Sequence, residues 1–248
     1  MAYDLSNFEL SDMTRCGADL RATGAAAASM EQAAEGVVRH LYDHLTDATG
    51  RRCCVLVRLF TTLDYSELHD NLREFGRGLM EGHTLEPQTK CLTLLATGGD
   101  EPPWNSRRES AGHKTIPLPS EHVVLQIPMI SQLIRQLGLD VATVVRPDPA
   151  LLLELDQKKY NVFHVPNAQG SPFIPAQAEF VVPYGIRSVL GFGGVFPTGN
   201  MFAVLMFTRV GIARTTAEMF RTAALNTKIA LLPFAAGPVF SPSEPEAT

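Results

Sequence analysis

The sequence has no excess of basic residues. Its 248 residues include 21 Lys and Arg against 26 Asp and Glu, which gives a formal net charge of −5. Proteins that bind nucleic acid normally carry a basic face, so this balance argues against a nucleic-acid partner. The first residues also lack the positive and apolar regions of a signal peptide, so we expect a cytoplasmic location. Apolar residues make up 45% of the chain and charged residues 19%, a composition typical of a globular protein.

Cysteine is scarce, and its spacing matches no metal site. The four cysteines are Cys16, Cys53, Cys54 and Cys91; they form no C-x-x-C motif, and no Cys/His cluster has zinc-finger spacing. We therefore expect buried, reduced thiols in a reducing compartment, with no bound metal.

One segment without charge is long enough to cross a bilayer. The 21 residues between Arg187 and Arg209 include no Asp, Glu, Lys or Arg. Residues 197–200 (PTGN) lie in its middle, and turn residues between two apolar runs favour a β-hairpin. We therefore expect paired strands over residues 186–210, covered on both faces, and no membrane partner.

Apolar periodicity places further elements on both sides of this hairpin. A helix is predicted from Ser29, whose spacing to Gln32 matches a capping box, and a last helix from Thr215, which has the same spacing to Glu218. The order favours an α+β fold, with a central antiparallel sheet and the N- and C-terminal helices packed on one face. The other elements that we expect are strands at 53–62, 90–97 and 141–145 and helices at 65–80 and 120–137.

Proline and turn residues divide the chain into three parts. Ten of the 17 prolines lie between Pro102 and Pro175, so we expect a loop-rich insert on the second face of the sheet. Residues 1–28 are expected to form a flexible N-terminal lead, residues 29–234 a single domain and residues 235–248 a disordered tail.

The C-terminal third resembles the closing segment of GAF domains. The residues that carry the resemblance are the phrase Gly185–Ser188 (GIRS), the turn at 198–200, the strand at 201–207 and the acidic Glu218 in the last helix. It extends over roughly residues 29–232. The resemblance implies a sensory or regulatory domain that binds a small molecule between the sheet and the irregular loops. It also implies signalling through the terminal helices, often in a homodimer.

Five residues are candidates for the ligand pocket. Trp104 could stack on a ligand. His113 and His164 lie in the proline-rich loops, where an imidazole could hydrogen-bond a ligand or bind haem iron. Phe163 and Phe192 complete the apolar lining that we expect. No catalytic residue, metal ligand or specific cofactor is identified, and we expect no enzyme activity.

Two other functions stay open. A thiol-dependent reductase of the GAF type would use Cys54 or Cys91, although their spacing does not match that of the free methionine-(R)-sulfoxide reductases. A ligand-free interaction module would have its pocket filled by Phe and Leu side chains and would act only by dimerisation or docking.

Overall fold

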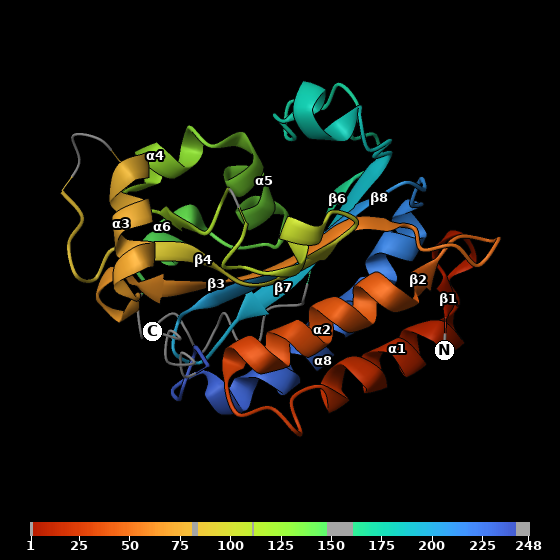
Figure 1. Cartoon of the computed structure of the whole chain (residues 1–248), viewed down its shortest axis with the longest axis horizontal. Coiled ribbons are helices and arrows are strands. Elements are labelled where there is room, and N and C mark those ends of the chain that lie inside the picture. The colour runs from red at the N-terminus through yellow and green to blue at the C-terminus, as the bar shows by residue number, and fades with distance from the viewer. Residues whose placement is uncertain (1, 81–83, 111, 148–160, 242–248) are drawn as a thin grey trace.

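A six-stranded antiparallel sheet forms the centre of the molecule (Figure 1). The computed structural model describes residues 2–80, 84–110, 112–147 and 161–241. The order of the strands is β5-β4-β3-β8-β7-β6, and every neighbouring pair is antiparallel. The strands of this sheet are β3 (Cys54–Asp64), β4 (Lys90–Gly99), β5 (Thr115–Pro117), β6 (Val162–Val165), β7 (Ser188–Val195) and β8 (Met201–Thr208).

Helices cover both faces, so the predicted α+β architecture is confirmed. The longer helices are α1 (Leu10–Ala22), α2 (Met30–His44), α3 (Asp70–Leu79), α5 (Pro128–Gln136) and α8 (Arg214–Leu231). The short elements are β1 (Tyr3–Asp4), β2 (Leu45–Thr46), η1 (Leu5–Asn7), η2 (Tyr65–Glu67), η3 (Pro102–Asn105), α4 (Glu121–Leu125), α6 (Val141–Val145), η4 (Gln177–Val181) and η5 (Leu232–Phe234).

The uncharged segment folds as the predicted hairpin. Ser188 of β7 pairs with Thr208 of β8 at one end, and Val195 pairs with Met201 at the other. Gly199 adopts a φ of +85° in the connecting turn, a conformation that glycine tolerates without strain. Both strands are largely buried because helices lie on both sides of them. No helix among the described residues is long and apolar enough to span a membrane.

The terminal helices α1, α2 and α8 lie together on one face of the sheet (Figure 1). The Ser29 hydroxyl caps α2 by accepting a hydrogen bond from the Gln32 amide, as its spacing predicted. The predicted cap of α8 is wrong: its N-cap is Ala213, which has no side-chain oxygen, and Arg214 pairs with Glu218 instead. The helix forms without that cap because its buried face packs against the sheet.

The opposite face carries the predicted insert, with α4, α5, α6 and η4 packed on the sheet. The strand predicted at 141–145 is wrong, because these residues form α6. The Asp140 side chain caps the helix by accepting from the Ala142 amide at 3.3 Å, and three valines of α6 are buried against the insert. Tertiary burial therefore overrides the strand preference of a valine-rich segment.

The N-terminal residues differ from the flexible lead that we expected. Residues 3–22 form β1, η1 and α1. Tyr3, Leu5, Phe8 and Leu20 are almost fully buried in the core shared with α2 and α8. This apolar contact stabilises the segment. At the other end, Val239 packs against the core, while residues 242–248 of the predicted disordered tail lie outside the described residues.

Candidate functional site

A cavity lies between the sheet and the insert. It has a volume of about 340 Å³ and is bounded by β3, β4 and β8 on the sheet side and by α5 and the segment before η4 on the other. Most of its lining side chains are aliphatic or aromatic. They are Leu56, Arg58, Phe60, Leu92, Trp104, His113, Ile116, Ile127, Pro128, Met129, Ile130, Leu133, Ile174, Pro175, Ala176, Phe180, Leu205 and Phe207, together with Gly112.

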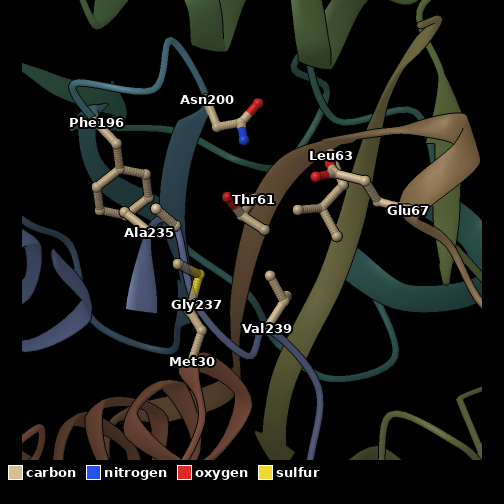
Figure 2. A pocket seen from close by; sticks show the side chains of 10 residues that line it. Met30, Thr61, Leu63, Glu67, Phe196, Asn200, Ala235, Gly237 and Val239 are labelled. Carbon is tan, nitrogen blue, oxygen red and sulfur yellow. The ribbon is translucent and has the colours of Figure 1, made fainter. Parts of the chain in front are cut away.

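A second, smaller cavity lies beside the C-terminal segment. Figure 2 shows Thr61 and Leu63 of β3 with Asn200 of the hairpin turn and Met30 at the start of α2. Its volume is about 130 Å³, which is room for about four water molecules at the roughly 30 Å³ that each occupies in the liquid. The larger cavity is therefore the better candidate for an organic ligand.

Strand alternation sets the floor of the larger cavity. Side chains two residues apart point to the same face of a strand, so Leu56, Arg58 and Phe60 of β3 all face the insert. Leu205 and Phe207 of β8 lie opposite Arg58 and Leu56 and extend the same surface. Arg58 is thus the one charged side chain among these apolar residues of the sheet.

Arg58 has few partners for a charged side chain in this position. Its Nη2 donates to Ser110 Oγ at 3.2 Å, while Nε is buried without a partner among the described residues. No carboxylate pairs with it in the part of the chain that the structure describes. Burial lowers the pKa of Arg58 to about 10, so the guanidinium keeps its charge at neutral pH.

Thr97 is a second under-satisfied polar group beside Arg58. The two residues are directly paired across β3 and β4, so their side chains share the cavity face of the sheet. Thr97 is 5% exposed, and its hydroxyl has no partner among the described residues. Buried polar groups are nearly always hydrogen-bonded in folded proteins, so this pair is unusual.

His113 lies at the edge of the cavity in the loop before β5. Its φ of +58° is in the left-handed region, which a side chain with a Cβ rarely adopts. The imidazole keeps solvent-accessible surface, and yet the surrounding protein and then the Arg58 charge lower its pKa below the usual value. His113 is therefore mainly neutral at pH 7 and can donate one hydrogen bond.

Aromatic rings close another side of the cavity. Trp104 of η3 lies edge-on to Phe180 with 5.5 Å between ring centroids, and Tyr184 lies 4.8 Å from the same indole. Phe180 in turn contacts Phe207 on the sheet at 5.1 Å. Gly99 leaves room for the indole, because a Cβ there would lie 2.8 Å from Trp104 Cε3.

The loop that carries Trp104 also contacts α2. Asn105 accepts a hydrogen bond from Arg39 of that helix at 2.9 Å. Arg107 forms a buried ion pair with Glu31 in the first turn of α2. The loop between β4 and β5 thus joins the cavity to the terminal helices.

The structure brings together only part of the predicted pocket. Trp104 and His113 line the cavity, and Phe163 is buried on the same face of the sheet without reaching it. His164 and Phe192 lie on the other face of the sheet, which the terminal helices α1, α2 and α8 cover. His164 Nε2 is 3.0 Å from the Ile212 carbonyl oxygen, and Phe192 stacks on a phenylalanine of α8. Neighbouring residues of a strand point to opposite faces, so Phe163 and His164 could not line one pocket.

Arg58 is the residue that sequence reasoning missed. It is the single charge in the strand segment CCVLVRLFTT, at residues 53–62. A lone charge within a buried strand requires a partner or a function, because an unpaired charge is costly to bury. That signal was present in the sequence.

The described residues offer no metal centre. No group of three or more His, Cys, Asp and Glu side chains among them is arranged to hold a metal ion. All four cysteines are free and buried. Burial raises the pKa of Cys16 and Cys91 to about 12. A hydrogen bond with Cys53, together with burial, raises the pKa of Cys54 well above its usual value.

The comparisons with known proteins matched structures alone. No protein-family model matches the chain, and neither does any curated protein sequence. The GAF domain of a phosphoenolpyruvate-protein phosphotransferase from Coxiella burnetii is 15% identical, with 91% of this chain and 95% of that chain covered and a TM-score of 0.43.

Two further solved structures match at lower scores. CepR2 of Burkholderia cenocepacia, an N-acylhomoserine lactone-dependent LuxR family transcription factor, is 13% identical. The match covers 92% of this chain and 99% of that chain, with a TM-score of 0.41. The phytochrome photosensory core module of Stigmatella aurantiaca is 11% identical. The match covers 92% of this chain and 38% of that chain, with a TM-score of 0.37.

Proposed function

We propose that this chain is a GAF-like sensory or regulatory domain that binds a small molecule in the cavity between the sheet and the insert. The observation that carries the proposal is the 340 Å³ cavity, whose described lining residues form apolar walls with one cation, Arg58. Ligand pockets are usually preformed clefts of about 300–1,000 Å³, lined by apolar side chains with a few polar groups that orient the ligand. This cavity fits that description.

A route from the cavity to the terminal helices supports the regulatory part of the proposal. Trp104 lines the cavity, and Arg107, three residues later, pairs with Glu31 at the start of α2. Asp100, which precedes η3, accepts a hydrogen bond from Tyr42 of α2 at 2.6 Å. A ligand that displaces Trp104 would move a loop that is tied to α2 at both ends.

Dimerisation through the terminal helices is the second part of the proposal. Leu225 and Ile229 of α8 are one turn apart and are 42% and 40% exposed, and Leu232 follows at 41%. Such a stripe suits association with a second copy of α8. Static light scattering should give a dimer for the native chain and a monomer for Leu225→Glu. A native monomer would refute this part.

The cytoplasmic location belongs to the same proposal. Four cysteines without a disulfide are in keeping with a reducing compartment.

The two alternative functions receive less support from the site. Buried thiols with raised pKa values are poor nucleophiles, which disfavours a thiol-dependent reductase. An open cavity disfavours an interaction module whose pocket is filled by side chains.

Ligand binding can be tested with the chain's single tryptophan, Trp104, because it lines the cavity. A small-molecule library would be screened by thermal shift, with hits checked by Trp104 fluorescence. Ile127→Trp fills the cavity, whereas Leu125→Trp places the same ring on an exposed position outside it. Hits should raise the melting temperature of the native chain and Leu125→Trp, but not of Ile127→Trp; a library without hits would refute ligand binding. Both variants contain a second indole, so their fluorescence does not report on Trp104 alone. Native mass spectrometry would therefore confirm that each hit binds.

A further inference from the structure

The charge inside the cavity restricts what it can bind. Arg58 is the one charged side chain among the described lining residues, since none of them is acidic and His113 is mainly neutral at pH 7. A cationic ligand would be repelled by the guanidinium. A neutral ligand would leave the guanidinium without a counter-charge in an apolar cavity, which is costly.

The polar groups around Arg58 are unsatisfied in the described chain. Arg58 Nε and the hydroxyl of its cross-strand neighbour Thr97 both lack partners among the described residues. Both atoms are covered, while Arg58 as a whole is partly exposed and lines the cavity. A guanidinium in this state has capacity for an anionic acceptor, and carboxylates match its planar donor geometry.

We infer that the ligand is an apolar monocarboxylate whose carboxylate pairs with the Arg58 guanidinium and whose apolar part fills the space under α5. This inference rests on the proposed function, because it concerns the ligand of the same cavity. One cation calls for one negative charge, so a phosphate dianion is a poorer match. The neutral His113 imidazole supplies a further N–H donor at the cavity edge.

The volume sets the size of the ligand. An apolar cavity of about 150 Å³ holds one benzene molecule, with six carbon atoms. By that measure the 340 Å³ cavity holds up to about fourteen non-hydrogen atoms. Octanoate and 4-phenylbutyrate fall in this range and differ in shape, so they serve as two probes of the class.

The test compares each acid with its neutral primary amide by titration of Trp104 fluorescence and by calorimetry. The variants are Arg58→Met, which keeps an apolar stem and removes the charge, and Arg77→Met, which removes an exposed arginine on α3. We expect at least one acid to bind the native chain and Arg77→Met about tenfold or more tightly than its amide. Arg58→Met should lose that preference while its affinity for the amide changes little.

Several outcomes would overturn the inference. Equal affinity for acid and amide in the native chain would do so without any variant, which matters if Arg58→Met fails to fold. Failure of both acids, in a chain that binds other library compounds, would also overturn it and leave the proposed function standing. If neither the acids nor any library compound binds, the proposed function fails first.

Discussion

Replacing Glu31 by Gln tests the contact between the cavity loop and α2. Glu31 forms an ion pair with Arg107, and the two side chains are only 7% and 10% exposed. Its second carboxylate oxygen accepts from the Ser241 amide at 2.8 Å, so the residue also holds the C-terminal segment. The substitution keeps the shape of the side chain and removes the carboxylate that pairs with Arg107, which then keeps its electrostatic interaction with Glu35.

The magnitude follows from the burial of the pair. Removing one partner of a buried ion pair costs about 3–5 kcal/mol, because the other charge stays buried alone. Arg107 also lies 4.8 Å from the centre of the Phe240 ring, a cation–π contact that survives the change. We therefore expect the lower end, about 3 kcal/mol. For a chain of this length that lowers the melting temperature by about 6–12 °C.

Differential scanning calorimetry and urea unfolding would measure the effect in a double-mutant cycle with Arg107→Met. Glu218→Gln is the matched control, since Glu218 pairs with Arg214 on the surface of α8 and the two side chains are 44% and 65% exposed. An exposed helical pair contributes about 0.3–0.5 kcal/mol, or roughly 1–2 °C here. The reasoning is refuted if Glu31→Gln changes stability as little as the control, or if the two changes in the cycle are additive.

Three further predictions concern stability and reactivity. Burial lowers the pKa of His40 and His164, so the unfolded state binds more protons below about pH 6.5; the melting temperature should fall between pH 7.5 and 5.5, and a rise would contradict this. Gly191→Ala places a Cβ 2.8 Å from a backbone oxygen of β8 and should cost about 1–3 kcal/mol in urea unfolding, whereas Gly78→Ala, with open space around it, should be neutral or stabilising. The four buried thiols should resist Ellman's reagent in the native chain and react in urea; fast native labelling would revive the thiol-dependent alternative.

The sequence predicted those elements whose signals are local. The hairpin followed from turn residues at 197–200 between two apolar runs, and the start of α2 from the spacing of Ser29 and Gln32. α6 was mistaken for a strand because a cap at Asp140 and burial against the insert outweigh the preference of valine. The helix at 10–22 was missed because its buried face includes small residues such as Cys16 and Gly17, which give a weak apolar stripe.

The candidate site was harder to predict because it depends on register. A shift of one residue moves a strand side chain from one face of the sheet to the other. Trp104 and His113 could be placed at the cavity from the sequence because they lie in loops of the insert, which reach the cavity whatever the register of the strands. His164 was not separated from Phe163 because no strand was predicted at residues 162–165. Phe192 is placed by the pairing of β6 with β7, in which it lies opposite Val162. Such pairings are long-range and leave no local pattern.

Arg58 differs from two other cations of this fold, Lys90 and Arg107, in the partners of its charge. Lys90 is 8% exposed on β4, and its Nζ lies 2.7 Å from Asp64 and 2.8 Å from the Asn200 side-chain oxygen. The Arg107 side chain is 10% exposed, and it forms an ion pair with the Glu31 carboxylate. At both of these positions a carboxylate of the chain pairs with the cation. Arg58 lies on the same sheet without such a carboxylate among the described residues, and it borders a cavity. The simplest physical reason for that difference is that its counter-charge arrives with the ligand.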